Sequence, residues 1–146
     1  QERLEAMRRE PPEALPSQRW PGMLWATPFQ PDRVLREGDV VAVGERSLRF
    51  VSTPGHTRGH QSVLVASGGE TVCFVGDLVP TSHHLKPIYV MAYDLYPRET
   101  FVNKQAILNQ AVQDQWLVVW PHDPEIGWSY VQVDDRDGFV AIDPLD

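Results

Sequence analysis

Short apolar runs separated by turn residues constrain the fold of this chain more than any other feature of its sequence. Each run is four to six residues long, which is typical of strands and too short for a core helix. We predict strands over residues 40–43, 47–52, 62–66, 71–75, 116–120, 128–133 and 139–142. The runs SVLVA and TVCFV are almost continuously apolar, which indicates strands that are covered on both faces.

One long helix is predicted over residues 97–115. Pro97 suits its first turn, and Asn, Gln and Lys are expected opposite an apolar stripe. The stripe consists of Phe101, Ile107, Leu108, Ala111 and Val112. Together with the strands, this helix predicts a layered α/β fold over residues 31–146. Residues 1–30 are expected to form a short helix, over residues 2–9, and a connecting segment rich in Pro and Trp.

Size and charge narrow the class of protein. The 146 residues suit one domain, and the net charge of −7 argues against nucleic acid or an anionic membrane surface as a partner. The longest apolar runs are much shorter than a membrane span. The single cysteine, Cys73, is expected in a buried strand, which excludes an intrachain disulfide and favours a cytoplasmic location.

Imidazole and carboxylate side chains follow three of the predicted strands. His56 and His60 follow the strand 47–52, Asp77 follows the strand 71–75, and His122 follows the strand 116–120. Rigid strand ends hold such groups while the loops admit a substrate. Two imidazoles and a carboxylate, one from each strand end, make a plausible set of ligands for zinc or a similar divalent metal.

Each of these residues also has an ordinary interpretation. Taken singly, His122 and Asp77 are common loop and turn residues, and their position after buried strands is what favours a shared site. Within HTRGH, Gly59 allows a sharp turn and the Thr57 hydroxyl can cap a short helical turn. The residues alone leave open which histidine holds the loop and which enters the site. A Ser or Cys nucleophile is poorly supported, because the sequence has no Gly-x-Ser-x-Gly elbow and its cysteine lies within a strand.

Three stretches resemble the second half of the metallo-β-lactamase superfamily. They are TPGHTRGH at 53–60, FVGD at 74–77 and WLVVWPHD at 116–123, and they occur in the order typical of that family. The resemblance extends from about Val34 to about Ile142. It implies that the chain is the second, C-terminal half of a four-layer αββα sandwich.

The resemblance also implies roles for individual residues. His60 is similar to a ligand of the first metal, Asp77 to the catalytic carboxylate that bridges two metals, and His122 to a ligand of the second. The loop would then be supported by His56, Thr57 and Gly59. The implied cofactor is a pair of divalent metals, zinc first and iron or manganese as alternatives. The implied reaction is the attack of a metal-bound hydroxide on a small ester, lactone or related substrate.

The chain departs from the family pattern in one respect. The motif His-x-His-x-Asp-His, with which the family's first half supplies four further metal contacts, has no counterpart in this sequence. We therefore expect the C-terminal part of a longer enzyme, inactive by itself and lacking its N-terminal half. A sheet deprived of that partner would expose apolar side chains, so that a homodimer is a further possibility.

The substrate is expected at the segment after Asp77. Residues 76–97 should line the mouth of the site, with His84, Tyr89 and Tyr93 as candidate contacts to a small-molecule substrate. The lactonase-like branch is favoured, and a glyoxalase-II-like thioesterase is an alternative. The first alternative to a hydrolase is a non-catalytic half domain, or interaction module, whose histidines are structural, and the thioesterase is the second.

Overall fold

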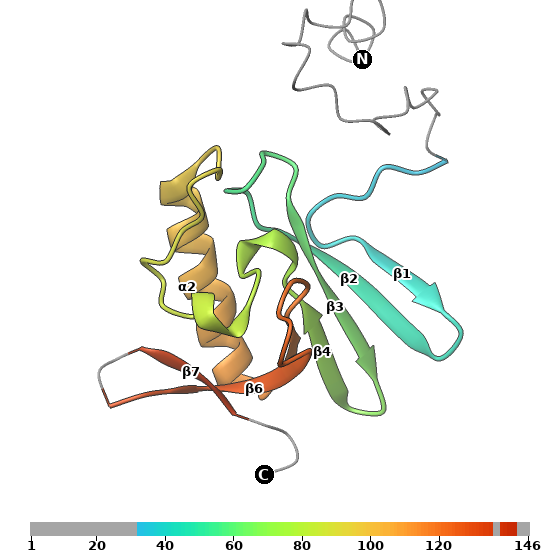
Figure 1. Ribbon diagram of the computed structural model, residues 1–146. Coiled ribbons are helices and arrows are strands. Elements are labelled where there is room, and N and C mark those ends of the chain that lie inside the picture. Colours follow the sequence, from blue (N-terminus) through green and yellow to red (C-terminus); the bar gives the residue numbers. More distant parts are fainter. Residues whose placement is uncertain (1–31, 136–137, 143–146) are drawn as a thin grey trace, which may run out of the picture. The chain divides into compact units, whose positions relative to one another are not determined.

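A computed structural model describes residues 32–135 and 138–142 of the chain (Figure 1). The chain divides into two compact units, Gln1–Val34 and Leu35–Asp146, and the fold belongs to the second. The predicted helix over residues 2–9 and the Pro/Trp-rich segment lie outside the described residues. No helix in the described part of the chain is long and apolar enough to cross a membrane.

The second unit is built on a mixed sheet with the strand order β1-β2-β3-β4-β5-β6-β7. All neighbouring strands are antiparallel except β4 and β5, which are parallel and joined through the single long helix, α2. The strands are β1 (Val40–Val43), β2 (Arg46–Ser52), β3 (Gln61–Ser67), β4 (Glu70–Phe74), β5 (Leu117–Val119), β6 (Trp128–Val133) and β7 (Phe139–Ile142). The helices are η2 (Gly76–Leu78), η3 (Ser82–His84) and α2 (Pro97–Gln113).

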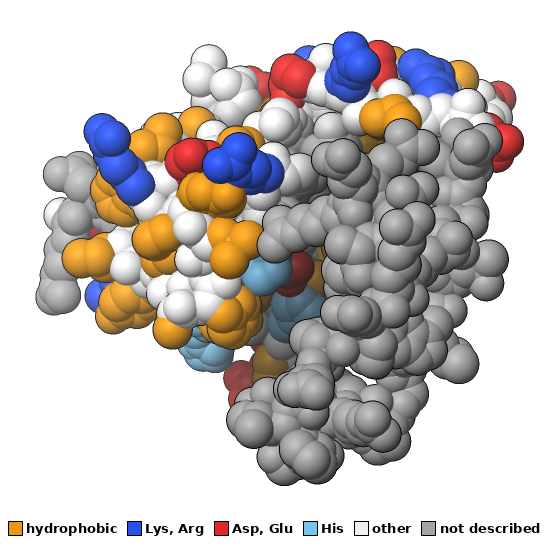
Figure 2. Space-filling view, turned by 90° about the horizontal axis from the view of Figure 1, so that it is seen from above, with side chains coloured by type: hydrophobic (Ala, Val, Ile, Leu, Met, Phe, Trp, Pro, Cys, Tyr) orange, Lys and Arg blue, Asp and Glu red, His pale blue; other side chains and the backbone are white. Residues whose placement is uncertain are grey.

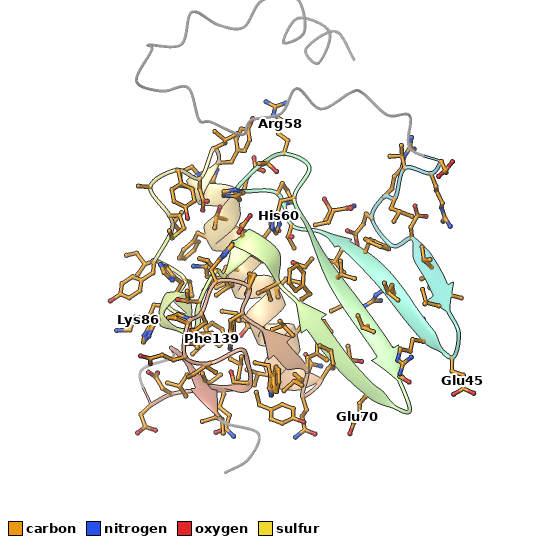
Figure 3. The ribbon with its side chains drawn as sticks, turned by 45° about the vertical axis from the view of Figure 1, so that its right-hand side comes forward. Glu45, Arg58, His60, Glu70, Lys86 and Phe139 are labelled. Carbon is orange, nitrogen blue, oxygen red and sulfur yellow. The ribbon has the colours of Figure 1, made fainter. Side chains whose placement is uncertain are left out.

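The hairpin between β3 and β4 shows how the local sequence sets the topology. Gly68 and Gly69 both have positive φ angles, 61° and 88°, which is the requirement of the tight turn that joins antiparallel strands. The short turns place the loops after β2, β4 and β5 at one end of the sheet. In Figure 3 Glu45, in the turn between β1 and β2, and Glu70, at the start of β4, lie at the opposite end of the sheet from His60.

Helix α2 packs against one face of the sheet. Leu64, Cys73 and Val118 on the sheet share a buried cluster with Ile107 and Leu108 of the helix. Burial of each such side chain stabilises the fold by about 1.5–3 kcal/mol. The Cys73 thiol is fully buried, as predicted, and its burial raises its pKa to about 12.

The helix differs from the predicted stripe at two positions. Lys104 is buried with 1% of its surface exposed, whereas Phe101 is 37% exposed. The reason is that the Lys104 ammonium donates hydrogen bonds to the carbonyl oxygens of His84 and Tyr89, at 3.0 and 2.5 Å. Helical periodicity identified the right face at Ile107 and Ala111 and could not anticipate a buried lysine that binds backbone carbonyls.

The opposite face of the sheet is apolar and only half covered. The strand register places one row of side chains on this face. The row comprises Phe50, Val63, Val65, Val72, Phe74, Leu117, Val119 and Trp128. Phe74 and Trp128 are 42% and 57% exposed, so the prediction that β3 and β4 are covered on both faces is wrong for this chain as it stands.

Candidate functional site

Three loops meet at one end of the sheet, as the strand order requires. Strands β2 and β4 both run antiparallel to β3, and β5 is parallel to β4, so the loops that follow β2, β4 and β5 leave from the same end. These loops carry His56 and His60, Asp77 and His122 respectively. Figure 2 shows histidine and acidic side chains gathered at this end, beside a group of hydrophobic side chains.

The carboxylate of Asp77 lies between two histidines. His122 Nε2 is 2.8 Å from Asp77 Oδ1, and His56 Nε2 is 3.6 Å from Asp77 Oδ2. The backbone fixes this arrangement on both sides: Gly76, with a φ of 59°, turns the chain into η2, and the His122 amide donates to the Pro80 carbonyl at 2.9 Å. The His122 side chain is 62% exposed and that of Asp77 41% exposed, so this group is open to solvent.

His56 is held from behind by a buried carboxylate. Its Nδ1 lies 3.0 Å from Asp94 Oδ1, and the Asp94 side chain has no exposed surface. Because a carboxylate can only accept, His56 Nδ1 is the donor in this contact. A histidine whose Nδ1–H is donated to a carboxylate while Nε2 points outward is the usual arrangement of a metal-binding imidazole.

His60 has a different environment from His56. Its Nδ1 lies 2.9 Å from Thr53 Oγ1 and 3.1 Å from the Thr53 carbonyl oxygen, to which it must donate. Its Nε2 packs against the turn at Gly76, where an added Cβ would come within 2.7 Å of that nitrogen. Burial lowers the pKa of His60, and the contact with the Thr53 carbonyl acts in the opposite direction. His60 thus connects the two ends of its own loop.

The other two loop residues have smaller parts than the sequence suggested. Thr57 contributes its carbonyl oxygen, which accepts from the amides of Gly55 and His60 at 3.1 and 3.4 Å, and no capping bond from its hydroxyl is seen. Gly59 has no positive φ and open space around it, so it is not the glycine that the loop requires. That glycine is Gly55, where an added Cβ would lie 2.3 Å from Thr100 Oγ1.

Of the three candidate substrate contacts, Tyr93 lies next to the group around Asp77. Its ring meets that of His56 edge to face with centroids 5.6 Å apart, and its side chain is largely exposed. His84 Nδ1 instead contacts Thr81 Oγ1 at 2.7 Å, and burial followed by the charge of Lys104 lowers its pKa. Tyr89 lies under the Lys86 ammonium, 5.6 Å from the ring centroid.

Two acidic residues had no predicted role and have clear positions in the structure. Asp123 Oδ2 accepts from both the amide and the hydroxyl of Ser82, and its Oδ1 accepts from the amides of Glu125 and Ile126. Burial would raise its pKa, but these hydrogen bonds outweigh burial and hold the pKa well below its usual range. The second residue is Asp94, for which the sequence does hold a signal: it is the one charged residue between Pro87 and Pro97.

The described side chains fit a divalent metal in chemistry but not in number. His56, Asp77 and His122 offer imidazole nitrogen and carboxylate oxygen, the donors that zinc and similar metals take. Within residues 32–135 and 138–142, however, no group of three or more His, Cys, Asp or Glu side chains is arranged to hold an ion by itself.

Comparison with known proteins settles the family. Residues 5–122 match the family model of the metallo-beta-lactamase superfamily. The chain belongs to this superfamily. The resemblance of the three strand-end stretches is thereby confirmed.

Members of the superfamily match the chain over limited stretches. An acyl-coenzyme A thioesterase from Gallus gallus is 40% identical over 52 residues, which are 36% of this chain and 18% of the relative. A hydroxyacylglutathione hydrolase from Chelativorans sp. (strain BNC1) is 46% identical over 46 residues, 32% of this chain and 17% of the relative. A dizinc quorum-quenching lactonase, solved with a product, aligns with a TM-score of 0.59 and 21% identity over 79% of this chain and 36% of its own. The chain thus spans less than two fifths of the length of each.

Proposed function

We propose that this chain is part of a metal-dependent hydrolase that cleaves a small ester, lactone or related acyl compound. The observation that carries the proposal is the Asp77 carboxylate held between His56 Nε2 and His122 Nε2, at 3.6 and 2.8 Å. The imidazole nitrogens of His56 and His122 and the carboxylate oxygens of Asp77 would hold a divalent metal. A bound metal lowers the pKa of water toward neutrality and so supplies a nucleophile.

The chain's own residues would divide the work as follows. Asp77 Oδ1 is held 2.8 Å from His122 Nε2, and the His122 ring is largely exposed. His56 is held by Asp94 through Nδ1, and its Nε2 lies 3.6 Å from Asp77 Oδ2. His56 therefore takes the ligand position in this proposal. The assignment of that position to His60 stays a prediction, which the packing of its Nε2 against Gly76 disfavours.

The half-covered apolar face of the sheet supports a larger assembly. Phe74 and Trp128 belong to a row of apolar side chains, and burying such a row against a second sheet would stabilise the protein. We propose that a further sheet of the whole protein covers this face, completing a four-layer sandwich, and that it also brings the missing metal ligands. The chain alone should then bind zinc weakly and hydrolyse little.

Zinc titration of the 146-residue chain by calorimetry tests the metal site. We expect weak binding that is lost in Asp77→Ala and in His122→Ala. Glu70→Ala is the matched control, since it removes a carboxylate at the opposite end of the sheet. A folded chain with no zinc binding, or the same loss in Glu70→Ala, would contradict the proposal and favour a non-catalytic module with structural histidines.

A thioester is the second candidate substrate. Two relatives, named acyl-coenzyme A thioesterase and hydroxyacylglutathione hydrolase, are 40% and 46% identical to this chain over short stretches. A lactone is supported only through the fold, because the lactonase is 21% identical. Hydrolysis of matched acyl substrates that differ in the leaving group (thiol, alcohol or ring alcohol) separates these candidates when measured on the longer protein.

A further inference from the structure

We propose that Asp94 is a positioning residue that holds the His56 imidazole by its Nδ1–H and so turns Nε2 toward Asp77. Asp94 lies outside the three strand-end stretches. It follows Asp77 by 17 residues, in the segment between η3 and α2. The inference rests on the proposed function only in that His56 Nε2 is taken to be a metal ligand.

The Asp94 carboxylate is buried, and packing alone does not explain why a charged group is placed there. Its side chain has no exposed surface, Oδ1 lies 3.0 Å from His56 Nδ1, and Oδ2 has no hydrogen-bond partner among the described residues. A buried polar atom without a partner destabilises the fold. Because the contact with His56 is the one hydrogen bond that this carboxylate makes in the described structure, orienting His56 accounts for its presence.

Backbone hydrogen bonds keep the pair together. The Leu95 amide donates to the His56 carbonyl at 3.3 Å, and the Tyr96 amide donates to the Gly55 carbonyl at 2.8 Å. The segment that carries Asp94 is therefore joined to the loop that carries His56 by two backbone hydrogen bonds directly after Asp94. The carboxylate meets the imidazole in a fixed frame, which is what a positioning residue requires.

Lys104 supports the same segment from the helix. Its buried ammonium binds the carbonyl oxygens of His84 and Tyr89, which lie upstream of Asp94. Burial lowers the pKa of Lys104 to about 8, while the negative charge of Asp94 acts against this decrease. The two buried groups of opposite charge thus stabilise each other within one electrostatic environment, and α2 fixes the segment that presents Asp94.

The consequence for His56 concerns its tautomer. With the proton of a neutral imidazole held on Nδ1 by Asp94, the lone pair of Nε2 faces Asp77. A carboxylate behind a metal-binding histidine fixes the ring orientation and makes the ligand more basic, and its loss typically reduces metal affinity by 10–100-fold.

The test compares two substitutions at Asp94 with one control. Asp94→Asn keeps the shape and a weaker acceptor, whereas Asp94→Leu removes the acceptor. Asn103→Leu is the control, because Asn103 Nδ2 donates to the Pro54 carbonyl at 2.6 Å and so supports the same loop without touching His56. Two readouts are used: the ¹⁵N signals of His56 in the metal-free chain, at a pH where the ring carries one proton, and the zinc affinity by calorimetry.

We expect His56 to carry its proton on Nδ1 in the wild type, to keep it largely there in Asp94→Asn, and to lose this preference in Asp94→Leu. Zinc affinity should fall by about 10-fold in Asp94→Asn and about 100-fold in Asp94→Leu. An unchanged tautomer in Asp94→Leu, or an equal loss of affinity in Asn103→Leu, would overturn the inference. If Asp94→Leu does not fold, the zinc affinity of Asp94→Asn decides, and an affinity equal to that of the wild type would overturn the inference.

The two proposals fail separately. If the wild-type chain binds no zinc but the His56 tautomer still depends on Asp94, the proposed metal site is rejected and the positioning role of Asp94 is retained. If zinc binds with full affinity in both Asp94 variants, the positioning role falls and the metal site stands.

Discussion

His56 and His60 occupy the same loop, four residues apart, and the fold gives them different surroundings. His60 is half-buried, donates to the carbonyl of Thr53 and packs its Nε2 against the Gly76 turn. His56 donates to Asp94 and directs its Nε2 at the exposed Asp77. Both rings have their Nδ1 atoms fixed, so the difference lies in what each Nε2 meets: the backbone of a turn or an accessible carboxylate.

The comparison teaches that spacing within a motif does not assign roles to its members. The sequence TPGHTRGH offers two equivalent imidazoles, and only the neighbouring segments distinguish them. Residues 94–96 reach His56 from far along the chain, whereas Thr53 reaches His60 from the start of the same loop. Local structure thus supports His60 and tertiary structure supports His56.

Removal of each ring should separate the two roles most strongly. We expect His56→Ala to reduce zinc affinity by roughly 100-fold or more, because a ligand is lost. We expect His60→Ala to change zinc affinity by less than about 10-fold while lowering the free energy of unfolding by about 1–3 kcal/mol, because Thr53 loses its partner. Calorimetry and urea unfolding measure the two quantities. The opposite pattern would return the ligand role to His60.

The contact between His60 and the Gly76 turn can be tested from the glycine side. Gly76→Ala should destabilise the chain by about 2–3 kcal/mol, since a positive φ costs about 1–2 kcal/mol and the new Cβ meets His60 Nε2. Gly44→Ala is a matched control with a φ of 60° and nothing within 4 Å of the added atom. The difference between the two unfolding free energies isolates the contact. Equal effects would mean that His60 is free to move away.

The Thr53 hydroxyl gives a finer measure of the loop support. Thr53→Val keeps the shape and removes the hydroxyl that contacts His60 Nδ1 and Ser62 Oγ, at 2.9 and 3.1 Å. We expect a loss of about 1 kcal/mol in stability and unchanged zinc affinity. Thr57→Val, an exposed position in the same loop, should change neither quantity. A drop in zinc affinity for Thr53→Val alone would link His60 to the metal.

The smallest effect is a pH dependence on the His56 side of the site. Lys104 has a folded pKa of about 8, below its usual 10.5, so the unfolded chain binds this proton more readily. Stability should therefore rise as the pH increases from 8 to 9, by at most about 1 kcal/mol and less after allowance for solvent screening. Urea unfolding of the wild type and Lys104→Met at pH 7, 8 and 9 isolates this contribution. Parallel pH profiles of the two proteins would contradict this prediction.

Above pH 9 the Cys73 thiol lowers the stability as the pH rises, because its pKa in the folded chain is raised to about 12.

Most elements of the fold were predictable because they follow from local patterns. All seven predicted strands are found, with boundaries within a residue or so, and the predicted helix over 97–115 is observed as Pro97–Gln113. The strand predicted over 116–120 is shorter, Leu117–Val119, because the flanking tryptophan amides bond to Ala111 and Gly127 outside the ladder. Apolar runs alone could not reveal that one face of β3 and β4 remains half covered.

The candidate site was predictable in part. The position of Asp77 and His122 after adjacent strands correctly indicated that they meet, because β4 and β5 are parallel neighbours. Their function as metal ligands stays a prediction. Asp94 and Lys104 were missed, since their partners are a side chain and backbone carbonyls in other segments, which no spacing in the sequence encodes.

The sequence by itself determined the positions of the strands along the chain, the polar residues at their ends and the family. These follow from alternation, turn residues and motif order, all of which are local. The tertiary structure alone decided which histidine faces Asp77, why Asp94 is buried and which face of the sheet is left apolar. The physical reason is that hydrogen-bond partners and burial depend on segments that only folding brings together.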